Sequence, residues 1–211
     1  MNQRSLLFAA AALISIFSVS VLAQKPPSMA AGPIERTIAK HPSVSDVNKH
    51  DQFSTDDGRF TITMPKDVDG FAAVTPEVAG RNVTGGGFRW RVREGGVFIN
   101  YFDYLDPDFR VATDDEYSRF FAAARDTILL SLDATLTSEE AVTLGKYRGR
   151  EIQFERAGRR HGFALIYFVD KRSYTLTALC DPAIGDAEVL LTRAFKTFTL
   201  ITPAKTASIK P

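Results

Sequence analysis

The sequence predicts an α+β fold in which helices pack on an antiparallel β-sheet. Three observations support this prediction. Most apolar segments alternate with a period of two, which is typical of strands with one covered face. Strands in the second half follow one another through short turns, without the crossovers that parallel pairing requires. Two further segments have helical spacing, and each carries one apolar stripe that can cover a sheet.

Residues 1–23 have the pattern of a secretory signal peptide. Arg4 is the only charged residue before Lys25, and the apolar run between them ends in small residues at Ala23. We expect cleavage after Ala23, which places the mature protein in the periplasm or outside the cell with no transmembrane span. The alternative is a retained membrane anchor, because the apolar run approaches the roughly 20 residues that a spanning helix needs.

The rest of the chain divides into one domain and two flexible ends. Residues 24–50 contain four prolines and no sustained apolar period, so we expect a flexible tether there. Residues 202–211 are predicted to be a disordered tail for the same reason. The segment between them, 51–201, has the length of a single ordinary domain, which we expect to be a monomer.

The first half of this domain is predicted to form strands, and Gly95-Gly96 supplies a hairpin turn. The triplet at 85–87 is interpreted as part of a glycine-rich loop. It is not followed by the Gly-Lys-Ser/Thr of a phosphate-binding loop. The strands are expected at 59–64, 88–93 and 97–104.

A long helix is predicted to start at Thr113 and to end near Ser131. Thr113 and Glu116 have the spacing of a capping box, and apolar residues then recur every three or four positions. Further strands and a closing helix follow, and Asp170-Lys171 is expected to form a tight turn. The strands are expected at 141–144, 149–155, 161–169 and 173–178, and the last helix after Gly185.

Composition excludes several classes of function. The chain has 211 residues, with 26 Lys+Arg against 25 Asp+Glu, so nucleic acid is not the expected partner. One cysteine rules out an internal disulfide, and the three histidines lack the spacing of a zinc site. We therefore expect no cofactor. Cys180 is predicted to be a buried, small apolar residue, with a reactive thiol as the alternative.

A row of arginines is the most distinctive charged feature. Strand alternation places their guanidinium groups on one face, where they form a candidate docking site for an anionic group. The alternative is a solvated face whose charge is balanced by Glu151 or Glu155 on adjacent strands. The residues are Arg89, Arg91 and Arg93, extended by Arg150 if its strand lies nearby.

Three aspartates around one turn are a candidate weak metal site. Asp103, Asp106 and Asp108 supply the carboxylate oxygens that calcium or magnesium prefers. Their spacing is not that of an EF-hand. The alternative is a turn-forming acidic loop that leads into the helix.

The order of elements also carries a family resemblance. The order is Phe53 with the segment 58–65, a pair of strands, a long helix, Gly149-Arg150-Glu151, Tyr167, Tyr174-Thr175-Leu176 and the closing segment 195–200. In this order, residues 51–201 resemble exported bacterial domains that share the fold of the photosystem II extrinsic protein PsbP, periplasmic DcrB and the Ran-binding Mog protein. The resemblance implies an accessory, binding or assembly role without a shared catalytic residue.

The sequence thus predicts an exported, non-catalytic binding or assembly module of the bacterial cell envelope. Its partner would be an envelope protein or an anionic surface component. The alternative is a periplasmic protein that binds a small molecule or metal ion, or an enzyme that uses surface carboxylates. A deep pocket with inward carboxylates would favour this alternative, and filled sheet–helix interfaces with shallow grooves would favour the first. The carboxylates are those of Asp103, Asp106, Glu151 and Glu155.

Overall fold

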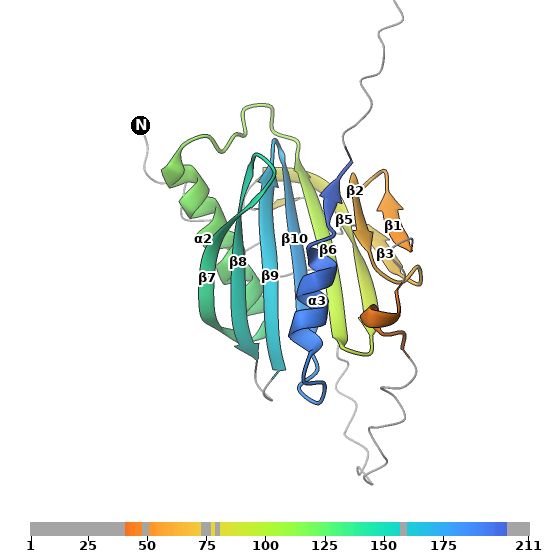
Figure 1. Cartoon of the computed structure of the whole chain (residues 1–211). Coiled ribbons are helices and arrows are strands. Elements are labelled where there is room, and N and C mark those ends of the chain that lie inside the picture. Colours follow the sequence, from red (N-terminus) through yellow and green to blue (C-terminus); the bar gives the residue numbers. More distant parts are fainter. Residues whose placement is uncertain (1–40, 48–50, 73–76, 79–80, 157–159, 202–211) are drawn as a thin grey trace, which may run out of the picture.

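The computed structural model describes residues 41–47, 51–72, 77–78, 81–156 and 160–201 (Figure 1). The predicted signal peptide and tail, and most of the predicted tether, lie outside these residues. The elements in chain order are η3 (Val44–Asp46), β1 (Gln52–Thr55), β2 (Phe60–Thr63), β3 (Asp69–Ala72), β4 (Glu77–Val78), β5 (Arg81–Val92), β6 (Gly95–Tyr104), α2 (Asp114–Leu132), β7 (Ala134–Leu144), β8 (Tyr147–Arg156), β9 (Arg160–Val169), β10 (Arg172–Cys180), α3 (Ala187–Phe195) and β11 (Thr199–Leu200).

The strands form two antiparallel sheets. The large sheet has the order β3-β5-β6-β10-β9-β8-β7, and β4 pairs with β5 at its edge. The small sheet has the order β1-β2-β11. Every pairing is antiparallel. Together with the two helices, this confirms the predicted α+β class.

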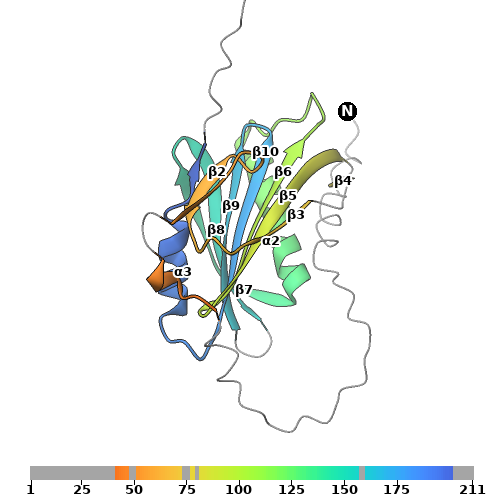
Figure 2. The same ribbon diagram turned by 90° about the vertical axis from the view of Figure 1, so that its right-hand side faces the viewer.

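The helices cover opposite faces of the large sheet, as Figure 2 shows. Helix α2 packs over β7 and β8, and its buried stripe contacts Ile152, Phe154 and Ile166. On the other face, α3 and the small sheet cover a second core that includes Trp90, Tyr174 and other large side chains. Strand β9 is buried on both faces because it lies between β10 and β8 under both layers, in agreement with its continuous apolar sequence.

The ends of α2 follow from local chemistry. The Thr113 hydroxyl accepts a hydrogen bond from the Glu116 backbone, and the Glu116 carboxylate accepts one from the Thr113 backbone at 2.9 Å. The hydrogen bonds that its carboxylate accepts from the Thr113 and Ala112 backbones lower the pKa of Glu116. The helix ends at Leu132, one residue beyond the predicted end, and Asp133 turns the chain in the left-handed conformation. The capping box is confirmed.

Two local predictions were wrong. The triplet at 85–87 is not a loop but lies inside β5, paired with β6. A Cβ at Gly85 would come within 2.1 Å of the Tyr101 carbonyl oxygen, so close strand packing overrides the low strand preference of glycine. Strand β7 also begins directly after α2, at Ala134, rather than at residue 141.

The described part of the predicted tether, 41–47, packs on the domain. The Ser43 hydroxyl donates a hydrogen bond to the fully buried carboxylate of Glu94, and the Val44 backbone donates another at 3.1 Å. The Arg93 backbone donates to the Pro42 carbonyl at 3.1 Å. The folded body therefore includes residues before 51, because Glu94 at the β5–β6 turn supplies a polar anchor for them.

Candidate functional site

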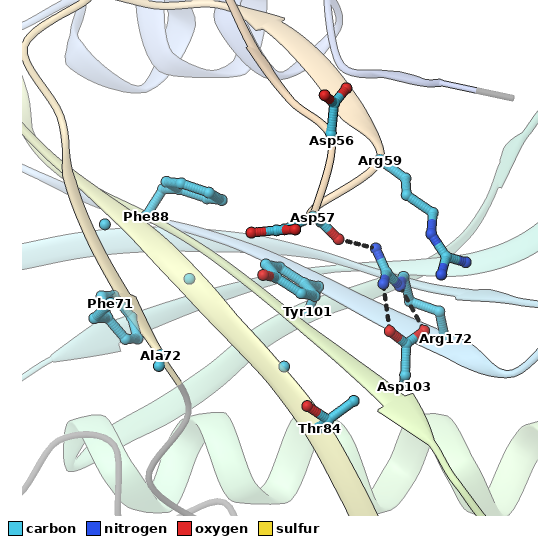
Figure 3. A pocket seen from close by; sticks show the side chains of 13 residues that line it. Asp56, Asp57, Arg59, Phe71, Ala72, Thr84, Phe88, Tyr101, Asp103 and Arg172 are labelled. Carbon is cyan, nitrogen blue, oxygen red and sulfur yellow. Dashed lines mark hydrogen bonds and ion pairs between the residues drawn. The ribbon is translucent and has the colours of Figure 1, made fainter. Parts of the chain in front are cut away.

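A cleft of about 670 Å³ opens on the face of the large sheet that also carries the small sheet (Figure 3). The β1–β2 turn forms one wall, β3 forms another, and β5, β6 and β10 supply the floor. Three carboxylates and two guanidinium groups lie in the lining, together with aromatic rings. The lining residues used below are Asp57, Arg59, Thr84, Phe88, Tyr101, Asp103 and Arg172.

Arg172 is the central support of this cleft. Its guanidinium group pairs through two nitrogens with the Asp103 carboxylate on the neighbouring strand β6, and its Nη1 donates to the Asp57 carbonyl at 2.7 Å. The group also lies over the Tyr101 ring, 4.8 Å from the centroid. Burial is the largest single influence and acts to lower the pKa of Arg172, but the interactions with Asp103 and Tyr174 together outweigh it, so the pKa is raised. Arg172 therefore joins the sheet to the β1–β2 turn.

A second side chain on the floor of the cleft, Tyr174, also holds the β1–β2 turn. The Tyr174 hydroxyl donates to the Gly58 carbonyl at 2.9 Å. The next residue, Arg59, has φ of 55°, a left-handed conformation that a tight turn requires here. Burial raises the pKa of Tyr174, so the hydroxyl keeps its proton for this bond at neutral pH. The wall of the cleft is thus held in one position by Arg172 and Tyr174.

One end of the cleft, formed by Phe88, Tyr101 and Asp57 and called the inner end below, is aromatic and negatively charged. The rings of Phe88 and Tyr101 lie nearly parallel, with centroids 6.4 Å apart. Figure 3 shows the Asp57 side chain directed toward these rings, whereas the Arg59 guanidinium lies on the other side, near Arg172. Burial raises the pKa of Tyr101, and the nearby charge of Asp57 raises it further.

The hydroxyl of Tyr101 is a second polar group at this end, beside the Asp57 carboxylate. Tyr101 is only 9% exposed and lines the cleft. A Cβ at Gly86 would come within 3.1 Å of this hydroxyl, so glycine at that position leaves space around it. The cleft therefore holds a hydroxyl that can act as donor or acceptor toward a ligand.

Of the three predicted arginines, Arg89 and Arg91 lie on β5, whereas Arg93 follows the last residue of the strand. Arg89 donates to Asp69 on β3 at 2.8 Å. Arg91 is exposed, and Arg93 lies 3.9 Å from the buried Glu94. The carboxylate that balances the charge of Arg89 is thus that of Asp69 on the adjacent strand β3. Neither of the two glutamates predicted for this role takes it. Those two, Glu151 and Glu155, lie on β8, separated from β5 by three strands.

Arg150 does not extend this row. It lies on β8 and faces α2, where its Nε is 3.4 Å from Glu139 and its guanidinium lies over the Phe121 ring. Arg125 of α2 donates to the same Glu139 at 2.7 Å. Arg150 therefore stabilises the packing of α2 on β7 and β8, because the strand order places it far from β5.

The three predicted metal-binding aspartates do not converge. Asp103 pairs with Arg172, and the Asp106 carboxylate accepts a hydrogen bond from the Asp108 backbone at 3.0 Å, as in a turn. Across the described ranges, no three His, Cys, Asp or Glu side chains are grouped so that they could hold a metal ion. The geometry thus corresponds to the turn-forming alternative.

Cys180 is buried, as predicted, at 4% exposure. Burial, with a smaller effect from Glu188, raises the pKa of its thiol to about 12. The Cys180 thiol therefore stays protonated at neutral pH, and it is a poor nucleophile because the thiolate is the reactive form.

This raised pKa predicts a loss of stability in alkaline solution. The folded state keeps the thiol protonated, whereas the unfolded chain releases the proton near pH 9, so the stabilisation is complete below pH 9 and is lost as pH rises toward 12. Between pH 8 and pH 10, the free energy of unfolding should fall by about 1 kcal/mol less in Cys180→Ala than in the parent chain. Urea unfolding at both pH values measures this, and equal losses would contradict it.

Apart from Asp103, sequence reasoning missed the residues that build the cleft. Arg172 opens a strand that is otherwise apolar, directly after the Asp170-Lys171 turn, and this charged residue in an apolar context was the available signal. No motif or spacing in the sequence marks Asp57 or Tyr101 as part of a site. The pairing of β6 with β10 brings them together.

Comparisons with known proteins give a structural likeness but no relative in sequence. No model of a known protein family matches the sequence, and no curated protein does. Among solved structures, the chain is similar to cyanobacterial PsbP (CyanoP) from Synechocystis sp. PCC 6803. The two share 16% sequence identity, the match covers 71% of this chain and 91% of that chain, and the TM-score is 0.48. This likeness concerns the arrangement of the chain alone, and the DcrB-like and Mog-like resemblances stay predictions.

Proposed function

We propose that this protein is an exported, non-catalytic binding module of the bacterial cell envelope, and that it holds its ligand in the cleft beneath the β1–β2 turn. The N-terminal pattern of residues 1–23 supports export. No helix in the described part of the chain is long and apolar enough to cross a membrane.

The observation that carries this proposal is that some polar groups of the cleft are bonded to one another, whereas others face the open volume. The groups that could act on a substrate, Asp103 and Arg172, are used by each other and by the turn above them. The groups that face the open volume, Phe88, Tyr101 and Asp57, have the shape and polarity of a binding surface. A cavity of about 670 Å³ is within the usual range for small-molecule sites.

This cavity also favours one part of the alternative, a periplasmic protein that binds a small molecule. The enzyme and metal variants of that alternative receive no such support from the geometry. The carboxylates named for them lie on β6, on the following loop and on β8, and only Asp103 lines the cleft. The arginine face with Arg91 and Arg93 stays a proposed contact for an anionic envelope component.

The proposal is tested by filling the cleft. Thr84 is exposed at the cleft and opposite Asp103, so Thr84→Trp should occupy the volume without disturbing the core. The full chain is incubated with a small-molecule extract of its native envelope, and retained compounds are identified by mass spectrometry. We expect the parent chain to retain a compound, chemically unchanged, that Thr84→Trp retains at least about tenfold less.

Thr143→Trp, at an exposed position of β7, is the matched control and should retain the compound like the parent chain. Equal retention by all three chains would remove the cleft from the proposal. Recovery of the compound in a chemically altered form would show turnover and overturn the non-catalytic assignment.

A further inference from the structure

The inner end of the cleft offers an unusual combination of groups. Tyr101 and Phe88 present two nearly parallel rings, and the Asp57 side chain is directed toward them. Aromatic faces attract cations, and organic cations with apolar bodies gain more from such a surface than hydrated metal ions do. A carboxylate beside the rings adds a charged hydrogen-bond acceptor.

The charges around the cleft favour the same sign of ligand. Its lining carries three carboxylates, from Asp56, Asp57 and Asp103, against two guanidinium groups, from Arg59 and Arg172. Arg172 is fully engaged by Asp103 and by the Asp57 carbonyl. Arg59 lies on the far side from Phe88. The inner end is therefore left with the uncompensated carboxylate of Asp57.

The hydroxyl of Tyr101 adds a hydrogen-bonding group at the same place. Tyr101 lines the cleft, and its hydroxyl can donate or accept a hydrogen bond. An ammonium group has three donors and no acceptor, so it can bind a hydroxyl oxygen and a carboxylate together.

We infer that the cleft binds a small organic amine, with its ammonium group held between the Asp57 carboxylate and the Tyr101 hydroxyl and its apolar body against Phe88. This inference rests on the proposed function, since it names the ligand class of the same cleft. The cavity is much larger than a single ion requires, which agrees with an organic body attached to the ammonium group.

Three probes of nearly equal shape test the charge directly. They are 2-phenylethylamine, 2-phenylethanol and phenylacetate, which share a benzene ring and carry a cation, a neutral hydroxyl and an anion. Each is titrated into the ¹⁵N-labelled full chain, and affinity is read from the amide signals of Thr84 and Gly86. We expect the amine to bind at least about tenfold more tightly than the alcohol and the acid.

Two variants locate the effect. Asp57→Asn removes the charge but keeps the backbone carbonyl that Arg172 binds, and it should weaken amine binding about tenfold. Tyr101→Phe keeps the ring and should weaken it about threefold. Asp67→Asn, at an exposed position that does not line the cleft, removes the same charge from the chain and should leave amine binding unchanged.

The other outcomes overturn the inference in distinguishable ways. Tighter binding of phenylacetate would show that Arg59 selects an anion, and the cleft would still be a binding site. Equal binding of all three probes, insensitive to Asp57→Asn, would show an aromatic site without charge selection. If 2-phenylethylamine does not bind at about 20 mM, roughly the weakest affinity that the titration can detect, the amine inference is refuted. The Thr84→Trp experiment then decides separately whether the cleft binds any compound.

Discussion

Replacing Arg172 with methionine is expected to lower the free energy of unfolding by about 3–5 kcal/mol, a loss typical of breaking a buried ion pair. The side chain is 5% exposed, and its partner Asp103 is 24% exposed. Removal of the guanidinium group leaves the Asp103 carboxylate and the Asp57 carbonyl without their donor. It also removes the cation that lies over the Tyr101 ring. Chemical denaturation by urea, followed by circular dichroism, measures the change.

Two further variants show whether the forked geometry causes this loss. Arg172→Lys keeps the charge but cannot make the paired contact and the contact to the turn together, so we expect a loss between those of the parent chain and Arg172→Met. Arg91→Met removes an exposed arginine from β5 and should change stability by less than about 0.5 kcal/mol. Similar small effects of Arg91→Met and Arg172→Met would show that Arg172 does not hold the turn.

Replacing Trp90 with alanine should cost about 3–5 kcal/mol, the usual range for removing a large core aromatic. Trp90 is fully buried on β5, between the large sheet and the small one. Its indole N–H donates to the Pro65 carbonyl at 2.8 Å, and its ring packs edge-on against Phe53. The alanine variant therefore loses packing between the two sheets and also the hydrogen bond to the segment that follows β2.

Trp90→Phe separates these two contributions. The smaller ring fills most of the space but leaves the Pro65 carbonyl without its donor, which should cost about 1–3 kcal/mol. The same denaturation experiment measures both variants. An equal loss for phenylalanine and alanine would mean that the hydrogen bond, and not the packing, dominates at this position.

The elements that the sequence predicted correctly depend on short-range rules. Alternation predicted the inward face of β5, and the spacing of Thr113 and Glu116 predicted the start of α2. These features depend on residues within one or two turns of the chain. The errors at 85–87 and at the start of β7 arose where strand pairing overrides local preference, as it does for the glycines that fit closely against Tyr101.

The candidate site followed a different rule. Arg89 and Arg150 look alike in the sequence, yet they have different partners in the structure. Arg89 on β5 pairs with Asp69, whereas Arg150 on β8 pairs with Glu139 toward the other end of the strand order. Asp103 looked like a metal ligand because Asp106 and Asp108 are its neighbours in sequence. In the structure its neighbour is Arg172, because β6 pairs with β10.

The sequence alone determined that this protein has an antiparallel sheet, two covering helices and a buried cysteine, because the periods of two and of about 3.6 residues are properties of single segments. Tertiary structure alone decided that a cleft exists and that Asp57, Tyr101 and Arg172 meet in it. These residues belong to three segments far apart in the chain, and only the pairing of β10 with β6 and the placement of the β1–β2 turn above them brings their charges and rings together.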